Sequence, residues 1–338
     1  MSVTIKDVAR VVGVAPSTVS RTLQDHPSIS QETKEKVRKA MDKLGYVPNA
    51  SAQNLANKFT NTIGVILPTM DSKERRSNPF YLEVISAMNE EARKQRVTIS
   101  IASGQTHDEL LENVQLMYRQ KRVDGFIMLY VQEEDIILDY LVDNAIPFTI
   151  IGRPYRYNNE SNCVDNDNQL LGQAATNHLI EKGHERIVFV TNNDSENFFQ
   201  ERFDGYRKAM KFQDKTSLDY FCLSHPEDYL LFEDYLKTKK PTGCIAIDDM
   251  FALRLIQMLN LLGYQVPDDI SVISFNNSIF TTLIHPYITS LDIQAELLGQ
   301  TAVVEFLIQL KEENAMKKHV IIPHTLIENE TVRDISKD

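Results

Sequence analysis

A short stretch near the N-terminus carries side chains that could read DNA. Directly after Pro16 it holds two serines, a threonine and an arginine: Ser17, Thr18, Ser20 and Arg21. Serine and threonine hydroxyls can bond to several base edges and to phosphates, and an arginine guanidinium can bind guanine through two hydrogen bonds. On one helix, these side chains are suited to the major groove of DNA. The competing interpretation is an ordinary helical hairpin whose exposed face is rich in hydroxyl groups.

The residues on either side predict the helices that would hold this stretch in place. Apolar residues at i, i+3, i+4 and i+7 predict a helix over 5–12, with Thr4 as its N-cap. Gly13 can adopt the positive φ that ends a helix, and the fixed φ of Pro16 suits the first turn of a second helix that runs to about Leu23. Two helices joined by a short turn containing glycine form the helix-turn-helix arrangement.

Two further segments follow within the first sixty residues. Ser30 is a predicted N-cap for a third helix, which ends at Gly45. Residues 49–58 contain a single large apolar side chain, Leu55, which is too little to hold so short a helix alone in water. We therefore expect this segment to become helical only when a partner orders it.

Charge is distributed unevenly along the chain. The net charge is −11, yet residues 1–60 contain nine Lys/Arg and five Asp/Glu, which leaves 27 Lys/Arg against 42 Asp/Glu in the rest. A basic end is suited to a polyanion, and phosphate attraction is local because salt screens charges beyond about 8 Å. The acidity of the whole chain therefore does not exclude nucleic acid as a partner.

Length and composition favour a soluble, cytoplasmic protein of several domains. With 338 residues, of which 42% are hydrophobic, the chain is long enough for two or three domains. The three cysteines lie far apart without a CxxC motif, which argues against a disulfide framework or a zinc site. No apolar run is long enough to predict a membrane span, and the charged N-terminus does not resemble a signal peptide.

From residue 62 onward the pattern changes to short strands that alternate with helices. Seven runs rich in β-branched residues predict strands, and residues with helical patterns separate them. The runs read TIGVILP, VTISIAS, VDGFIMLY, PFTIIG, RIVFVT, GCIAID and ISVISF. Apolar strands that alternate with helices indicate an α/β fold with parallel sheets covered on both faces, here divided into two similar subdomains.

Ligands of such sheets bind beyond the carboxyl ends of the strands, so the residues after each run are candidate binding residues. They combine aromatic rings with amides, a carboxylate and one arginine: Phe80, Tyr81, Tyr130, Asn192, Phe198, Arg202, Asp248 and Asn276. Rings can stack on the C–H faces of a sugar while polar groups bind its hydroxyls, so the set favours a polyhydroxylated ligand. The alternatives are a core position for Tyr130 and Phe198. For Asp249, a helix cap is favoured over a ligand contact.

Signatures of catalysis are missing from the chain. It contains no GxSxG, P-loop, HExxH or glycine-rich dinucleotide-binding motif. We therefore expect no enzymatic activity and no cofactor.

Taken together, the motifs resemble those of the lactose-repressor/galactose-repressor (LacI/GalR) family. The resemblance is carried by VTIKDVARVVGVAPSTVSRTLQ, by KLGYVPNASAQNLA and by the strand-rich region behind them, and it covers essentially the whole chain. It implies a helix-turn-helix headpiece over 1–48, a hinge helix and linker over 49–61, and a core over 62–338 with the fold of periplasmic sugar-binding proteins. Within that core it implies a first subdomain of about 62–162 plus 292–322. The second would comprise about 163–291 plus 323–333.

The resemblance also implies which residues touch DNA. The second helix would lie in the major groove, and residues 49–58 would form a helix that pairs across a homodimer in the minor groove. Leu55 would be the wedge inserted at the central base step, a known means of kinking DNA, with docking of Leu55 on the core as the alternative. The implied contacts are Thr4, Pro16, Ser17, Thr18, Ser20, Arg21, Asn49, Ala52, Leu55 and Lys58.

For the core, the resemblance implies a sugar effector. It carries over Arg202, Asp248 and Asn276 as effector-binding, although the family usually has Asp where this chain has Asn276. The segments VDGFIMLYVQEED and VDNDNQLLG resemble the maltose-operon repressors of Gram-positive bacteria. The expectation is a homodimeric repressor that binds a pseudo-palindromic operator and is released by maltose or a maltodextrin. The alternative function is a sugar-binding protein whose N-terminal helices mediate protein contacts instead of DNA binding.

Overall fold

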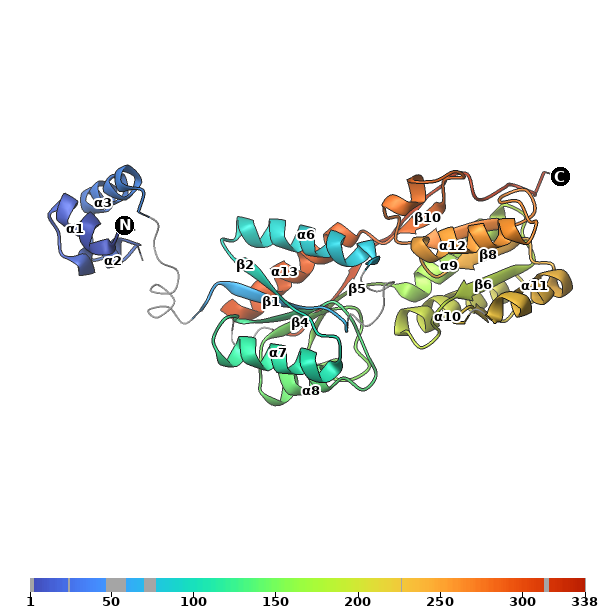
Figure 1. The fold of residues 1–338 in the computed structure, drawn as a ribbon, viewed down its shortest axis with the longest axis horizontal. Coiled ribbons are helices and arrows are strands. Elements are labelled where there is room, and N and C mark those ends of the chain that lie inside the picture. Colours follow the sequence, from blue (N-terminus) through green and yellow to red (C-terminus); the bar gives the residue numbers. More distant parts are fainter. Residues whose placement is uncertain are drawn as a thin grey trace. The chain divides into compact units, whose positions relative to one another are not determined.

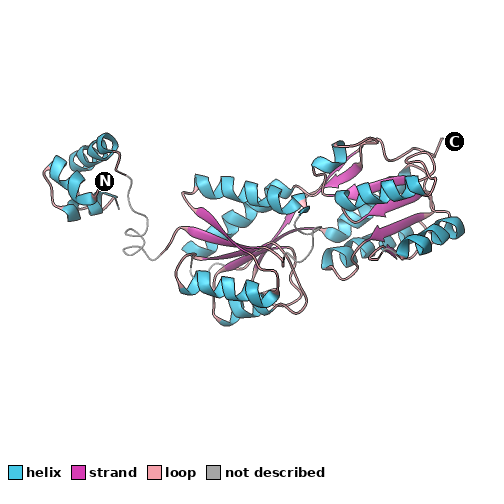
Figure 2. Cartoon of the chain, in the orientation of Figure 1, coloured by secondary structure: helices cyan, strands magenta, loops and turns pink. Residues whose placement is uncertain are grey.

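The computed structural model describes residues 3–23, 25–46, 59–69, 77–225, 227–312 and 316–337. The chain divides into two compact units, Met1–Thr60 and Asn61–Asp338 (Figure 1). The first unit is helical, and the second contains two β-sheets covered by helices (Figure 2).

The described part of the first unit contains three helices around a small apolar core. They are α1 (Ile5–Val12), α2 (Pro16–Leu23) and α3 (Gln31–Leu44). Each contributes a fully buried valine, namely Val8, Val19 and Val37. The predicted helix ends are confirmed, because Gly13 and Gly45 follow α1 and α3 with φ of 74° and 63°, the left-handed conformation that glycine adopts without a steric cost.

The predicted caps of α1 and α3 are also present. The amide and the hydroxyl of Thr4 both donate to the Asp7 carboxylate, at 3.0 and 2.7 Å. The Ser30 hydroxyl accepts the Thr33 amide at 3.3 Å. The Thr4 and Thr33 amides, which have no partner inside a helix, are thereby satisfied, while the Thr4 hydroxyl bonds to the Asp7 side chain and not to a backbone amide.

The first sheet of the second unit is parallel, with strand order β11-β5-β4-β3-β1-β2. Its strands are β1 (Thr62–Ile66), β2 (Thr98–Ala102), β3 (Gly125–Met128), β4 (Phe148–Ile151), β5 (Asn162–Asn166) and β11 (His319–Ile322). Its helices are α6 (Pro79–Lys94), α7 (His107–Arg119), α8 (Ile136–Asp143) and α13 (Ala295–Lys311). Figure 1 shows α6 and α13 on one face and α7 and α8 on the other. Accordingly Ile63 and Val65 pack in the same cluster as Val84 of α6, whereas Ile66 packs with Leu110 of α7.

The second sheet has the order β12-β10-β9-β8-β6-β7 and is parallel except for the pairing of β12 with β10. Its strands are β6 (Ile187–Thr191), β7 (Phe221–Cys222), β8 (Gly243–Ala246), β9 (Ser271–Phe275), β10 (Thr289–Asp292) and β12 (Thr325–Ile327). Its helices are α9 (Asn168–Glu181), α10 (Asn197–Phe212), α11 (Asp228–Lys239), α12 (Asp249–Leu261) and the 3₁₀ helix η1 (Ile279–Thr282). The predicted α/β class is confirmed.

Three segments of the chain cross between the two sheets. The side chain of Asn166, in the first of these segments, bonds to the other two. The chain crosses after β5, after β10 and after β11. The Asn166 side-chain amide donates to the carbonyl oxygens of Ile293 and Ile322, at 3.0 and 2.9 Å. All three crossings are thereby held together at the end of β5.

One expected boundary differs from the structure. A division at 162/163 would place most of β5 in the second subdomain, yet Cys163 pairs with Ile150 of β4 and with His319 of β11 in the first sheet. The strand NCVDN was not predicted because it begins and ends with asparagine. Both Asn162 and Asn166 are nevertheless buried.

Candidate functional site

Helix α2 presents part of the predicted DNA-reading set to solvent. Ser17 and Arg21 are exposed, as is Pro16 at the start of the helix, whereas Thr18 and Ser20 are half-buried. The buried side of α2 contains Val19 and Thr22. The exposed Thr4 uses its hydroxyl within α1, as a donor to Asp7.

Four of the predicted DNA contacts lie outside the described residues. They are Asn49, Ala52, Leu55 and Lys58. Their DNA contacts, like those of the residues on α2, stay predictions.

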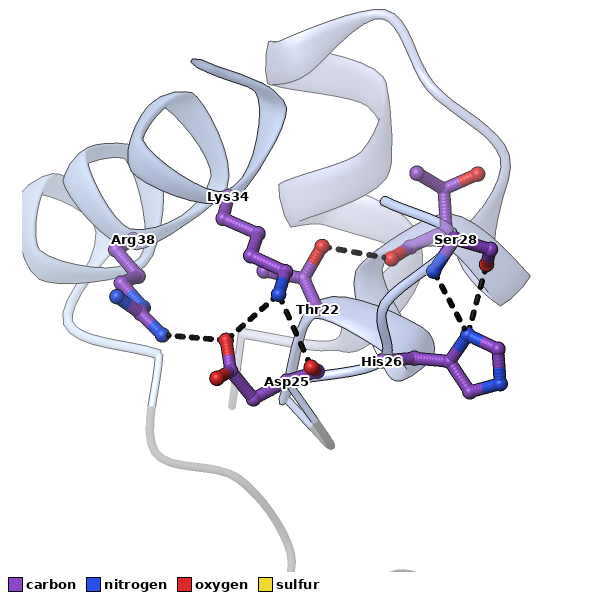
Figure 3. A network of polar contacts seen from close by, with 7 residues as sticks. Thr22, Asp25, His26, Ser28, Lys34 and Arg38 are labelled. Atoms are coloured by element: carbon purple, nitrogen blue, oxygen red, sulfur yellow. Dashed lines mark hydrogen bonds and ion pairs between the residues drawn. The ribbon is translucent and has the colours of Figure 1, made fainter. Parts of the chain in front are cut away.

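A buried lysine holds the loop after α2 against α3. The Lys34 ammonium donates to the Asp25 carbonyl oxygen at 3.0 Å and pairs with the Asp25 carboxylate at 2.9 Å, while its side chain is only 7% exposed. Arg38 binds the same carboxylate at 3.2 Å (Figure 3). The hydrogen bond from Lys34 is the main cause of the lowered pKa of Asp25. Because Lys34 is buried and bonded in this way, it positions the loop and is not available to a DNA phosphate.

We expect Lys34→Met to loosen the headpiece without removing a phosphate contact. Methionine keeps the apolar stem but loses both bonds to Asp25, at a cost of about 1–3 kcal/mol. Hydrogen exchange of the full chain should show lower protection in α1–α3, while the slope of log affinity against log salt for DNA stays unchanged. Arg21→Ala is the control, because it should weaken specific binding by about 1–3 kcal/mol and leave the protection intact. A reduced salt slope in Lys34→Met would contradict this assignment.

The eight predicted ligand residues all line one cavity of the second unit. Its volume is about 310 Å³, and residues at the carboxyl ends of strands from both sheets surround it. The lining also contains residues that the sequence did not single out, among them Asn78, Arg153, Asp165, Asn168, Asn193, Glu196 and Asn197. The cavity is therefore a candidate ligand site, and the ligand contacts of these residues stay predictions.

Arg202 is a buried cation in the wall of this cavity. Its Nε donates to Asn168 Oδ1 at 3.0 Å, and its Nη1 donates to the Ile247 carbonyl oxygen at 2.9 Å. The guanidinium carbon lies 4.4 Å from the ring centre of Phe275 and 5.1 Å from that of Phe198, a cation–π arrangement. Burial lowers the pKa of Arg202 to about 10, so it stays charged at neutral pH. A guanidinium has five N–H donors, which leaves some of them for a ligand oxygen.

Aromatic rings line the cavity from different parts of the fold. Phe80 and Tyr81 lie at the start of α6 with their ring centres 5.6 Å apart, edge to face. Phe198 is 37% exposed, so a core position, the alternative interpretation, does not describe it. Tyr130 is half-buried and packs on the apolar cluster of the first sheet while it also lines the cavity.

Two adjacent aspartates have roles that differ from the sequence interpretation. Asp248 is the N-cap of α12 and accepts the Phe251 amide at 2.6 Å. Asp249, which was expected to be the cap, is buried in the first turn and accepts the Ser278 amide at 2.5 Å. The cap assignment for Asp249 is therefore wrong by one residue. Burial raises the pKa of both carboxyl groups.

Asp165 is a lining carboxylate that the sequence analysis missed. It lies on β5 and accepts the Asn166 amide at 2.8 Å, with the Asn168 side-chain amide at 3.4 Å. Burial, helped by the charge of Glu201, raises its pKa to about 7. The sequence feature that could have pointed to Asp165 is the segment VDNDNQLLG, which contains it.

We expect Asp165→Asn to stabilise the unliganded core more at alkaline than at acidic pH. A carboxyl whose folded pKa is raised contributes stability below its unfolded pKa, and that contribution is lost as pH rises through the folded value. The gain of the variant at about pH 8 should be on the order of 2 kcal/mol, and smaller at about pH 5. Thermal unfolding at the two pH values measures it, with Asp204→Asn, an exposed carboxylate of α10, as control. Equal gains in stability at both pH values would show that the Asp165 carboxyl is ionised in the folded protein at the lower pH as well as at the higher one.

Neither a metal cluster nor a membrane helix is found in the part of the chain that the structure describes. No group of three or more His, Cys, Asp or Glu side chains there could hold a metal ion. No helix there is long and apolar enough to span a membrane.

Comparisons with known proteins agree with this architecture. Residues 4–49 match the lacI family of bacterial regulatory proteins, and residues 176–332 match the periplasmic binding protein-like domain. The HTH-type transcriptional regulator MalR of Staphylococcus xylosus is 34% identical over 338 residues, which cover 99% of each chain.

Solved structures show the same fold. A probable maltose operon transcriptional repressor from a Staphylococcus species has a TM-score of 0.75 at 28% identity, over 81% of this chain and 99% of that one. A lac repressor dimer bound to operator has a TM-score of 0.78 at 23% identity, over 98% of this chain and 100% of that one. At 23% identity, the similarity to the lac repressor supports only the shared fold. Through its full-length relative and its N-terminal match, the chain belongs to the lacI family of bacterial regulatory proteins, which are DNA-binding transcriptional regulators and not enzymes.

Proposed function

We propose that this regulator is a homodimeric repressor of genes for maltose or maltodextrin use, and that the sugar releases it from its operator. One observation carries the proposal: a single cavity brings together the aromatic rings and hydrogen-bonding groups that a sugar needs. The similarity to a probable maltose operon transcriptional repressor, at 28% identity, supports maltose or a maltodextrin as the sugar.

The chemistry of the lining supports a sugar as effector. The rings of Phe80 and Phe198 offer flat apolar faces for sugar C–H groups, and Asn192, Arg202 and Asn276 offer donors to hydroxyl oxygens. Asn276 also accepts, so the amide keeps hydrogen bonding where the family usually has a charge.

For DNA, we assign residues 1–48 to a headpiece and 49–61 to a hinge and linker. The exposed Ser17 and Arg21 of α2 would contact base edges in the major groove. Leu55 would enter the central base step in the minor groove. The core over 62–338 would bind the effector and form the dimer.

Exposed apolar side chains support a second copy of the chain as partner. Leu82 on α6 is 71% exposed, and Ile279 and Leu283 at η1 are 64% and 58% exposed. We assign these side chains to the contact between the two copies, because contiguous exposed apolar surface marks interaction sites. A two-fold dimer would present two α2 helices to two half-sites, which is why we expect a pseudo-palindromic operator.

Release would follow from a shift between two arrangements of the core. Residues of both sheets line the cavity, so a bound sugar would favour the arrangement in which both sides contact it. A ligand shifts an equilibrium only by its difference in affinity for the two states. The alternative, a sugar-binding protein with N-terminal helices for protein contacts, predicts sugar binding without DNA affinity.

A mobility-shift titration with the protein's own promoter region tests the proposal. At moderate salt we expect a specific complex that maltose or maltotriose weakens and lactose, the control, does not. Absence of a specific complex would refute the repressor. A specific complex that no maltodextrin weakens would refute maltose or a maltodextrin as the effector.

A further inference from the structure

In the described part of the chain four helices begin beside the cavity, and side chains of the protein already occupy three of their N-termini. The caps are Asn78 on α6, Asp167 on α9 and Asp248 on α12, which accept backbone amides at 3.0, 2.8 and 2.6 Å. Helix α10 begins after Glu196, a further carboxylate, which lines the cavity. A free helix N-terminus attracts phosphate groups. At α6, α9 and α12 the positive end of the helix dipole therefore meets a carboxylate or an amide oxygen of the chain itself, whereas the Glu196 carboxylate lies at the start of α10 without a capping bond to it.

Negative side chains also outnumber positive ones in the cavity wall. Among the described residues that line it, Asp165, Glu196 and Asp248 are acidic, and Arg153 and Arg202 are basic. Arg153 is exposed, so water screens its charge more strongly than it screens a buried charge. The wall therefore carries an excess of negative charge when its carboxylates are ionised.

The charge of Arg202 is already balanced by its neighbours. Asp165, Asp248 and Glu201 all favour the charged form of Arg202 and oppose the effect of burial on its pKa. Two of its donors are used on Asn168 and Ile247. A phosphate dianion at Arg202 would have to approach these carboxylates as well.

We infer that the cavity binds an uncharged sugar and rejects the same sugar once it carries a phosphate. This inference rests on the proposed sugar site and names the chemical class of its ligand. Carboxylates only accept hydrogen bonds, and sugar hydroxyls can donate to them. An ionised phosphate is also only an acceptor, so beside an ionised carboxylate of the wall, Asp248 or Asp165 above its pKa of about 7, it gains no hydrogen bond and is repelled.

The size of the discrimination follows from Coulomb's law. Two like charges at about 6 Å in an effective dielectric of about 20 repel enough to weaken binding on the order of 100-fold. We therefore expect the phosphate group to weaken sugar binding by about that factor.

Calorimetric titration of the full-length protein with maltose and with maltose 6′-phosphate tests the inference, at about pH 8, above the pKa of Asp165. Maltose should bind about 100-fold more tightly, and only maltose should weaken the operator complex at matched concentrations. Equal or tighter binding of the phosphate ester would overturn the inference and leave a sugar-responsive repressor in place. Failure of both sugars to bind would refute the proposed effector and this inference with it.

Asp248→Asn provides a second test that leaves the helix cap in place, because asparagine caps helices as well as aspartate does. Removing this charge should narrow the ratio between the two affinities by about tenfold. Asp204→Asn changes the charge of α10 at an exposed position paired with Arg207 and should leave the ratio unchanged. A ratio that responds equally to both substitutions, or to neither, would contradict local repulsion by the wall.

Discussion

Replacement of Arg202 by methionine is expected to give a repressor that stays on its operator in the presence of maltose. Methionine can still pack on Phe275 and Phe198, but it leaves Asn168 Oδ1 and the Ile247 carbonyl oxygen without their donor. Loss of a buried, bonded charge costs on the order of 3–5 kcal/mol. Sugar affinity should fall at least about 100-fold, since charge-assisted bonds to the ligand are lost as well.

Calorimetry with maltose and mobility shifts with operator measure the two effects separately. Arg207→Met is the matched control, because Arg207 lies on the same helix, is 62% exposed and approaches Asp204 only to 3.9 Å. It should keep normal sugar affinity and normal release. If Arg202→Met bound maltose as tightly as the unaltered protein, Arg202 would have no part in the effector site.

A single methyl group at Gly172 is expected to damage both the core and the sugar site. A Cβ at Gly172 of α9 would lie 1.9 Å from the carbonyl oxygen of Arg202, and a Cβ at Gly205 of α10 would lie 2.0 Å from that of Gln169. Both neighbours are backbone atoms, so the two helices would have to separate. Overpacking costs about 1–3 kcal/mol and occasionally more, and we expect Gly172→Ala at the upper end or beyond, with Arg202 displaced from the cavity.

Thermal unfolding and sugar titration of Gly172→Ala test this prediction. Gly243→Ala is the control, because the nearest atom to its added Cβ is the end of the flexible Leu179 side chain, at 3.3 Å. Its unfolding temperature should change little, whereas that of Gly172→Ala should drop by several degrees. Similar, small changes in both variants would mean that α9 and α10 can separate at no cost.

The headpiece could be predicted from the sequence because its signals act over single turns. Gly13 ends α1 through its own φ, Pro16 starts α2 through its ring, and Ser30 bonds to an amide three residues away. None of these effects needs information from distant parts of the chain. The Lys34 contact with Asp25 was not predicted, because a lysine on a helix that contains many charges gives no sign that it is buried.

In the core, the unpredicted features depend on residues far apart in the sequence. Asn166 is buried because its amide meets carbonyl groups 127 and 156 residues away. Strand β5 therefore lacks the apolar run by which the other strands were predicted, and Asp165 was missed with it. The position of the α12 cap at Asp248 instead of Asp249 has a similar origin. Either aspartate satisfies the capping rule, and only the position at which the strand ends decides between them.

The bonds of Asn166 also determine how the core can move. Because one amide joins the three crossings, any rotation of one sheet against the other has its pivot close to this side chain. Displacement grows with distance from a pivot, so the neighbouring Asp165 and Asn168 would move least. Residues of the two sheets farther from Asn166 would carry most of the relative movement.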